Sequence, residues 1–201
     1  MSTRIKICGL TRLEDALLAA RLGADFLGLV AAESRRRLTL EQAREVARAR
    51  ESHPVRTVGV FHRQPRTQIL EWIERVPLDL VQVHPEDGTD FPVPVVLTRR
   101  LGGPLSEAPP PQAGFCVYEI YVEGVPGGTG RTLPLEWLET GVAPGKFLLA
   151  GGLNAGNVAE RVRRLRPFGV DVSGGVESAP GVKDPAKLAQ FIEEVRRADL
   201  G

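Results

Sequence analysis

The chain has 201 residues, of which 42% are hydrophobic, and its 26 Lys and Arg against 25 Asp and Glu give a formal net charge of +1. This balance lacks the excess positive charge that holds nucleic acid or an acidic membrane surface, and it favours a small-molecule ligand. The length allows one well-buried core, so we expect a single domain over residues 1–201.

The chain begins with MSTRIKICGL, which has no apolar signal-peptide region, and no later stretch reaches membrane length. We therefore expect a cytoplasmic protein whose two cysteines, Cys8 and Cys116, stay reduced. The expected partners are a small phosphorylated molecule and, in a homodimer, a second copy of the chain; a monomer is the alternative, and neither nucleic acid nor membrane is expected.

Apolar strand-like runs alternate with helix-like runs from end to end, which is typical of βαβ units around a parallel sheet. Helices are predicted to begin at Thr11, Thr39, Pro65, Asn154 and Asp184, and all of these except Pro65 are good N-caps. Glu14 would complete a capping box with Thr11, and a short helical turn is predicted near Leu133–Leu138. The eight predicted strands are Ile5–Cys8, Asp25–Val30, Thr57–Phe61, Leu80–Val83, Pro94–Leu97, Phe115–Glu119, Phe147–Ala150 and Val170–Val172.

Eight such units normally need about 250 residues in a closed (β/α)8 barrel, and the shortage in this chain is local. Only HPEDGTDFPV separates the fourth and fifth strands, and TRRLGGPLSEAPPPQAG before the sixth is too rich in Pro and Gly for a helix. We predict an α/β fold, a single (β/α)8 TIM barrel with shortened or missing fourth and fifth helices. The alternative, an open doubly wound sheet, lacks its Gly-rich fingerprint after the first strand.

Two reactive side chains close predicted strands, where barrels keep their active sites. Cys8 ends the first strand in KICG, and Glu119 ends the sixth in FCVYEIY. Cys8 is either a nucleophilic or basic thiol, helped by a depressed pKa, or a small core hydrophobe. Glu119 is either a surface residue or, facing inward among apolar walls, a carboxyl group held protonated for use as a general acid.

Glycine clusters directly follow the last three predicted strands, in PGGTG, AGGLN and SGGVES. Any one of these clusters alone is typical of an ordinary turn. The loops after strands seven and eight, however, are where barrels commonly hold phosphate through backbone N–H groups. The predicted phosphate-binding residues are Gly151, Gly152, Ser173, Gly174 and Gly175.

Basic side chains follow the second and fourth strands. The arginines at 35–37 in SRRRLT form either a solvated face or a fork for a carboxylate, and His84 ends the fourth strand in VQVH. The three histidines, His53, His62 and His84, do not stand at ligand spacing, so we expect no metal.

Taken in order, KICGLT, GADFLGLV with SRRRL, VGVF, VQVH, PGGTG, LLAGGLNAGNV, GVDVSGGVES and PGVKD resemble the phosphoribosylanthranilate isomerase family of tryptophan biosynthesis. The resemblance implies a cofactor-free barrel that converts N-(5-phosphoribosyl)anthranilate into an open-chain 1-deoxyribulose by an Amadori rearrangement. It implies that Cys8 is the general base and Glu119 the general acid. It also implies that Arg37 recognises the anthranilate end, that His84 and Asp171 bind substrate, and that AGGL and SGGV bind phosphate.

The chain departs from the family pattern at two site positions. The family usually has aspartate at Glu119 and HG at His84-Pro85, and the TRRL after the fifth strand replaces a lysine-containing sequence. One alternative is a class I aldolase-like barrel that uses Lys6, whose side chain should point inward because it has the same strand parity as Cys8. Borohydride would trap the adduct that such a lysine forms with a carbonyl substrate. Another is a catalytically retired barrel that still binds phosphorylated ligands.

Overall fold

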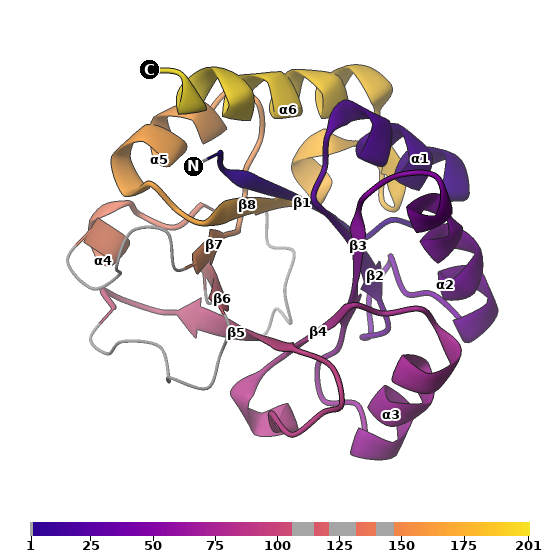
Figure 1. Ribbon diagram of the computed structural model, residues 1–201. Coiled ribbons are helices and arrows are strands. Elements are labelled where there is room, and N and C mark those ends of the chain that lie inside the picture. The colour runs from indigo at the N-terminus through magenta and orange to yellow at the C-terminus, as the bar shows by residue number, and fades with distance from the viewer. Residues whose placement is uncertain (1, 106–114, 121–131, 140–146) are drawn as a thin grey trace.

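A computed structural model describes residues 2–105, 115–120, 132–139 and 147–201, and in it eight parallel strands close into a barrel (Figure 1). Each strand is hydrogen-bonded to the next one in the chain, and the last pairs with the first. This closure confirms the predicted TIM barrel and rules out an open sheet. The strands are β1 (Arg4–Cys8), β2 (Phe26–Val30), β3 (Arg56–Val60), β4 (Leu80–Val83), β5 (Val95–Leu101), β6 (Phe115–Ile120), β7 (Phe147–Leu149) and β8 (Gly169–Val172).

The helices lie outside the ring of strands (Figure 1). Short 3₁₀ turns and a two-stranded hairpin complete the described elements. The helices are α1 (Leu13–Leu22), α2 (Leu40–Ala47), α3 (Arg66–Arg75), α4 (Glu136–Glu139), α5 (Val158–Leu165) and α6 (Pro185–Asp199). The remaining elements are the turns η1 (Arg48–Glu51), η2 (Pro85–Asp87) and η3 (Gly174–Val176) and the hairpin strands β9 (Glu177–Ala179) and β10 (Val182–Lys183).

The fourth helix is missing as predicted, because the three-residue turn η2 is the whole of the regular structure between β4 and β5. The fifth connection falls largely on residues 106–114, outside the described residues, and 102–105 before them carry no helix. The predicted turn of helix at Leu133–Leu138 is found slightly later, as the four-residue α4.

Apolar side chains fill one end of the barrel interior and support a polar layer above it. Because side chains alternate between the two faces of a strand, residues two positions further along point to the same interior. The apolar plug contains Phe26, Val58, Leu80, Val96, Val117 and Leu148. The polar layer contains the buried side chains of Lys6, Gln82, Thr98 and Asp171.

Two of the four predicted helix caps are confirmed. The Thr39 side chain accepts a hydrogen bond from the backbone of Gln42, whose own side chain accepts from the Thr39 N–H, so α2 begins with a capping box. The Asp184 carboxylate accepts from the N–H groups of Ala186 and Lys187 at the start of α6. Both residues satisfy donors that the first helical turn leaves without partners.

The other two caps are wrong, because other contacts take these side chains. The Thr11 hydroxyl donates to the carbonyl of Gly181 at 2.6 Å, and α1 begins after Arg12 without a side-chain cap. Asn154 instead closes a turn, in which its Oδ1 accepts from the Gly156 N–H, and α5 begins only at Val158. Asn and Thr stabilise such turns as readily as they cap helices.

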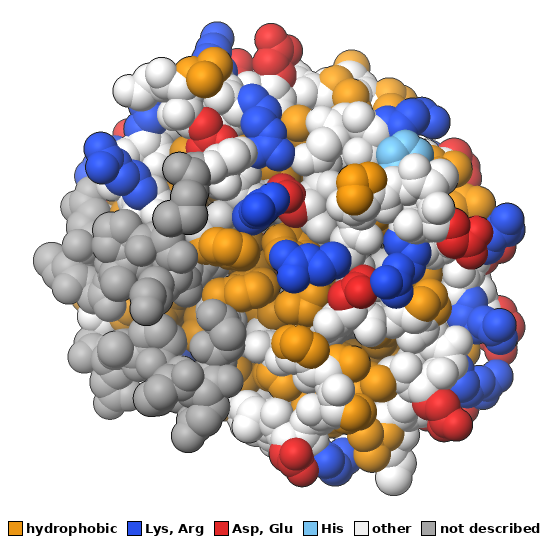
Figure 2. Space-filling view, in the orientation of Figure 1, with side chains coloured by type: hydrophobic (Ala, Val, Ile, Leu, Met, Phe, Trp, Pro, Cys, Tyr) orange, Lys and Arg blue, Asp and Glu red, His pale blue; other side chains and the backbone are white. Residues whose placement is uncertain are grey.

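Figure 2 shows one face of the barrel, on which Lys and Arg side chains alternate with Asp and Glu around the periphery. This mixture agrees with a net charge close to zero. Within the described residues, no helix combines the length and the apolar character needed to cross a membrane.

Candidate active site

A cavity of about 540 Å³ opens at the carboxyl ends of the strands. Every strand contributes a wall residue, either from within the strand or from the position directly after it. This is the end at which (β/α)8 barrels carry their active sites. The wall includes nine of the ten residues predicted for the site: Cys8, His84, Glu119, Gly151, Gly152, Asp171, Ser173, Gly174 and Gly175.

The Cys8 thiol ends β1, opposite Gly28 in the register with β2. A Cβ atom at Gly28 would lie 2.8 Å from the sulfur, so the glycine provides the space that the thiol occupies. Burial raises the pKa of Cys8 above its ordinary value, although the neighbouring Lys6 cation acts in the opposite direction. The depression that would help this thiol act as a base at neutral pH is thus not found.

Lys6 lies one layer deeper than Cys8, where its Nζ is 2.8 Å from Oδ2 of Asp171. Burial by itself would lower the pKa of Lys6, but the Asp171 carboxylate more than offsets this and raises it, so the amine stays charged. Oδ1 of Asp171 is buried and has no hydrogen-bond partner among the described residues. An unsatisfied buried acceptor is costly, so this oxygen is suited to a donor on a bound molecule.

Glu119 faces a cation, in contrast to the apolar walls expected from the sequence. Its Oε1 accepts a hydrogen bond from Nε of Arg100 on the adjacent β5 at 2.7 Å. The two side chains are only about one-fifth exposed, at 21% for Glu119 and 17% for Arg100. This contact with Arg100 fixes the orientation of the Glu119 carboxyl group at the cavity wall.

Arg35 and Arg36 of the SRRRL segment both line the cavity, and Arg36 is held there by a carboxylate. Its Nε and Nη2 donate to the two carboxylate oxygens of Glu177 at 2.8 and 2.6 Å. Nζ of Lys183 also donates to Glu177, at 2.8 Å, and to the backbone carbonyl of Cys8 at 2.7 Å. The hairpin β9–β10 thus connects Arg36 to the backbone of Cys8.

Two cations face the single carboxylate of Glu177. Burial alone would raise the pKa of Glu177, but the hydrogen bonds from Arg36 and Lys183 lower it below its ordinary value. The carboxylate is ionised and accepts from both. A bidentate pair of this kind fixes the plane of the Arg36 guanidinium.

Arg37, the arginine predicted to recognise a carboxylate, does not lie in the cavity wall. Its side chain is half exposed, pairs with Glu33 at 3.5 Å, and borders a separate shallow groove beside Thr39 and Trp72. Its backbone forms a parallel bridge with Val30. The cavity wall thus contains Arg35 and Arg36 of this segment and not Arg37, whose role in carboxylate recognition stays a prediction.

The two predicted phosphate loops follow β7 and β8 and meet at the cavity. Gly151 and Gly152 have φ angles of +89° and +60°, which side-chain-bearing residues rarely adopt. A Cβ atom at Gly175 would lie 1.8 Å from the carbonyl oxygen of Leu153, so only glycine allows the loops to approach this closely. The third cluster, PGGTG at 126–130, lies outside the described residues.

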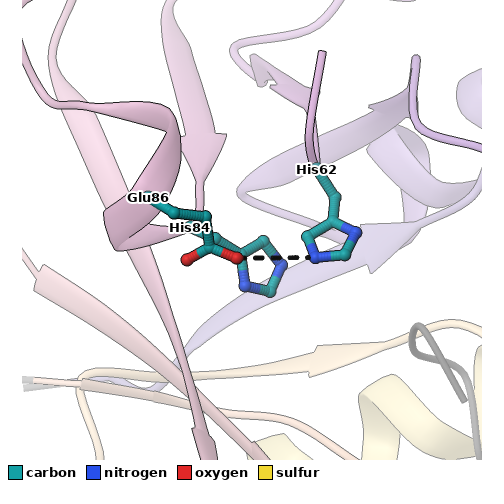
Figure 3. A group of neighbouring side chains, drawn as sticks. All are labelled: His62, His84 and Glu86. Atoms are coloured by element: carbon teal, nitrogen blue, oxygen red, sulfur yellow. Dashed lines mark ion pairs between the residues drawn. The ribbon is translucent and has the colours of Figure 1, made fainter. Parts of the chain in front are cut away.

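Two histidines stand side by side in the cavity wall with a glutamate beside them (Figure 3). The rings of His62 and His84 have centroids 4.2 Å apart, and Nε2 of His62 is 3.7 Å from Oε1 of Glu86. Burial, followed by the charge of Arg100, lowers the pKa of His84 to about 4 and also lowers that of His62. Both rings are therefore neutral at neutral pH.

Several wall and support residues were not identified from the sequence. Strand parity located Lys6, and the same argument places Gln82 in the interior. Glu177 and Lys183 lie in the motifs GVES and PGVKD, but the sequence pattern did not predict a role for either residue. Arg100 and His62 follow from contacts between different strands, which no local pattern reports.

The fold and the site define a class: a (β/α)8 barrel of the kind that enzymes use, with acidic, basic and thiol side chains around a cavity at the carboxyl ends of its strands. Residues 5–194 match the family model described as N-(5'-phosphoribosyl)anthranilate (PRA) isomerase. The chain belongs to this family.

Named relatives agree over the full length. An N-(5'-phosphoribosyl)anthranilate isomerase from Pseudomonas paraeruginosa is 43% identical over 205 residues, covering 97% of this chain and 96% of the relative. The crystal structure of phosphoribosyl anthranilate isomerase from Thermus thermophilus has a TM-score of 0.82 and 38% identity, covering 99% of this chain and 100% of that one.

A second solved structure contains a ligand. It is a phosphoribosyl anthranilate isomerase in complex with reduced 1-(o-carboxyphenylamino)-1-deoxyribulose 5-phosphate, with a TM-score of 0.73 and 28% identity, covering 97% of this chain and 99% of that one. A small phosphorylated molecule is therefore the ligand of that relative.

Proposed function

We propose that this protein catalyses the isomerisation of N-(5'-phosphoribosyl)anthranilate to 1-(2-carboxyphenylamino)-1-deoxyribulose 5-phosphate in tryptophan biosynthesis. One observation carries the proposal: Cys8 on β1 and Glu119 on β6 line the same cavity. Between these strands around the barrel stand β7 and β8, whose loops contain the glycine clusters. A base, an acid and a phosphate site therefore border a single cavity.

The phosphate end of the substrate is assigned to the loops after β7 and β8. Gly174 and Gly175 begin the turn η3, and the first N–H groups of such a turn have no partner inside it. Gly151 and Gly152 keep the opposite loop free of side chains close to the same space. Backbone donors of this kind favour an anion.

The anthranilate carboxylate is assigned to Arg36. A guanidinium has five N–H donors, and Glu177 accepts from Nε and Nη2, so further donors remain for a second carboxylate. The substrate would then be held at its two charged ends, which fixes the sugar between acid and base. Asp171, through its unpartnered Oδ1, is assigned to a sugar hydroxyl.

The first chemical step opens the sugar ring. We assign Glu119 as the general acid that protonates the ring oxygen, while the lone pair of the anthranilate nitrogen forms the C1=N bond and the C1–O bond breaks. Arg100 contacts Oε1 of Glu119, and the transferred proton is assigned to Oε2. The product of this step is a protonated Schiff base within the substrate itself.

The second step moves a proton from C2. The Cys8 thiolate takes the proton, the C2–H electron pair forms a C1=C2 bond, and the positively charged nitrogen accepts the displaced π electrons. The resulting enolamine tautomerises to the ketone. The Lys6 cation favours the thiolate, and burial opposes it.

The class I aldolase alternative requires an uncharged Lys6. The ion pair with Asp171 keeps that amine protonated, and a protonated amine has no lone pair with which to attack a carbonyl. Borohydride with a carbonyl substrate would trap a lysine adduct in an aldolase and would leave the protein unmodified under the present proposal.

The direct test is a fluorescence assay that follows loss of phosphoribosylanthranilate with purified protein. Turnover that increases linearly with protein concentration supports the proposal. Binding of the reduced product analogue without turnover would identify a barrel that has lost its catalytic activity. Absence of both binding and turnover would refute the assignment.

Assembly and location are part of the proposal. We propose a monomer or homodimer; one related structure is described as mutually generated monomers of a dimeric isomerase from Thermotoga maritima, with a TM-score of 0.76 and 27% identity. Sedimentation would distinguish the two states. A cytoplasmic location is supported by Cys8 and Cys116 being free thiols, which a reducing compartment preserves; a fluorescent fusion protein would test it.

A further inference from the structure

His62, His84 and Glu86 present three potential metal ligands to one point on the cavity wall (Figure 3). One ring nitrogen of each histidine and one carboxylate oxygen of Glu86 all lie within 4.8 Å of one another. We propose that these three side chains bind a divalent transition-metal ion, with Zn²⁺ as the best match, and that the bound ion inhibits the enzyme by obstructing the cavity.

The donor types select the class of ion. Zn²⁺ is commonly bound by two histidines and one carboxylate with a fourth position left open, whereas Mg²⁺ and Ca²⁺ prefer oxygen ligands. Tetrahedral bonds of about 2.0–2.2 Å place ligand atoms about 3.3–3.6 Å apart. The His62–Glu86 separation of 3.7 Å already lies near this range, and Glu86 is 53% exposed, so its side chain has room to adjust.

The backbone around the two histidines is held in place independently of any ion. The Asp87 carboxylate accepts hydrogen bonds from the N–H of Arg63 at 2.8 Å and from the N–H of His84 at 3.0 Å. It thereby joins the loop after β3 to the loop after β4. Arg63 adopts a φ of +62°, which is unfavourable for a residue with a side chain and occurs where the surrounding structure imposes it.

The charges around the cluster are nearly balanced without an ion. Arg63 and Arg100 oppose a cation, while Glu86 and Asp87 favour one, and Arg100 is itself paired with Glu119. A bound dication would therefore depend on direct coordination by the two imidazoles and the carboxylate. This makes the histidines the decisive residues in a test.

Binding is measured first, on the full protein freed of metal by chelation, by calorimetric titration with ZnCl₂ alone. We expect one ion per chain. Removing an outer-sphere partner of a metal ligand typically costs about 10–100-fold in affinity, and a lost direct ligand should cost at least that much. His62→Ala, His84→Ala and Glu86→Gln should thus each weaken binding at least about tenfold. MgCl₂ in excess should not compete.

His53→Ala is the matched control, because His53 lies before β3 and outside both the cavity wall and the cluster. It should bind Zn²⁺ as the parent chain does. Equal affinity in all the histidine variants would overturn the proposal, as would undetectable binding in the parent. The Cys8 thiol, which lines the same cavity, is a rival ligand for the ion.

A Co²⁺ titration distinguishes the two sites, because thiolate ligation adds a charge-transfer absorption that histidine and carboxylate ligands do not give. Absence of that band, with unchanged affinity in Cys8→Ala, supports the histidine site. Loss of binding in Cys8→Ala with retention in His84→Ala overturns it.

The inhibition experiment rests on the proposed isomerase activity, whereas the binding experiments do not. Zn²⁺ should raise KM reversibly in the parent and in His53→Ala, with at least about tenfold more Zn²⁺ needed in Glu86→Gln; inhibition that is equal in all three would refute the obstruction.

Discussion

The side of the barrel formed by β8, β1 and β2 differs from the side formed by β4, β5 and β6. On the first side, α1 packs against both α6 and α2. Hydrogen bonds among Arg36, Glu177 and Lys183 connect the loops to the backbone of Cys8. On the second side, η2 is the only helical element among the described residues between β4 and β6. Glu119 there depends on an ion pair with Arg100 of the next strand.

This difference separates the parts of the proposed reaction. The base and the phosphate loops stand on the side whose geometry is fixed by helices and by several connected ion pairs. The acid stands on the side where the connections are short and where the sequence departs from the family pattern. We therefore expect changes on the first side to follow family behaviour and changes on the second to report what is particular to this chain.

The largest effect is expected for Cys8. Cys8→Ala should lower kcat by about 10²–10⁴-fold or more, because a lost general base typically costs that much, while product affinity is retained. Steady-state kinetics and product titration measure the two quantities. Cys116→Ala is the control, since Cys116 is buried on β6 and outside the cavity wall. Comparable rates in the two variants would mean that Cys8 is a small core hydrophobe and not the base.

Glu119 tests the second side. Glu119→Gln removes the acidic proton but keeps the size, so we expect kcat to fall by about 10²-fold or more with product affinity nearly unchanged. Glu119→Asp restores the family's residue at a shorter reach and should remain partly active. Normal turnover in Glu119→Gln would mean that another group is the acid, and that the ion pair with Arg100 is only structural.

Variants of Arg36 and Arg37 test whether the carboxylate site lies at the partly buried guanidinium of Arg36. Arg36→Ala should weaken substrate binding by about 1.5–3 kcal/mol, the usual range for a charged hydrogen bond, and so raise KM about ten- to a hundredfold. Arg37→Ala should change KM little, since its side chain is half exposed and borders another groove. The reverse order would reinstate Arg37, the residue that the sequence suggested.

The pH profile measures the ionisation of the thiol. Burial raises the pKa of Cys8, so its thiolate fraction at pH 7 is smaller than that of a free cysteine, whose pKa is about 8.5. The rate of alkylation of Cys8 by iodoacetamide, measured in Cys116→Ala, follows this thiolate fraction and should therefore increase about tenfold per pH unit from pH 6 to 8. Lys6→Met, which removes a cation, should move this rise to higher pH. A rate of alkylation that does not change between pH 6 and 8 would contradict a raised pKa for the thiol.

The sequence predicted what depends on periodicity and on strand ends. The barrel, the missing fourth helix and the placing of Cys8, Glu119 and the glycine loops at one rim all follow from strand order. A local sequence pattern does not report how side chains from different strands share contacts. The choice between Arg36 and Arg37 depends on which of two adjacent residues faces the hairpin, and the pairing of Glu119 with Arg100 depends on the register of β5 and β6.

The smallest effects concern two threonines that the sequence treated alike. Thr39 caps α2, whereas the hydroxyl of Thr11 donates to Gly181, whose N–H donates in turn to Glu177. Thr39→Ala should lower the free energy of unfolding by about 1 kcal/mol, measured by urea denaturation, with kcat and KM unchanged. Thr11→Ala should cost a similar 0.5–1.5 kcal/mol, roughly one hydrogen bond. It should also raise KM, because it loosens the hairpin that orients Arg36; identical kinetics in both variants would show that this hairpin holds its position without Thr11.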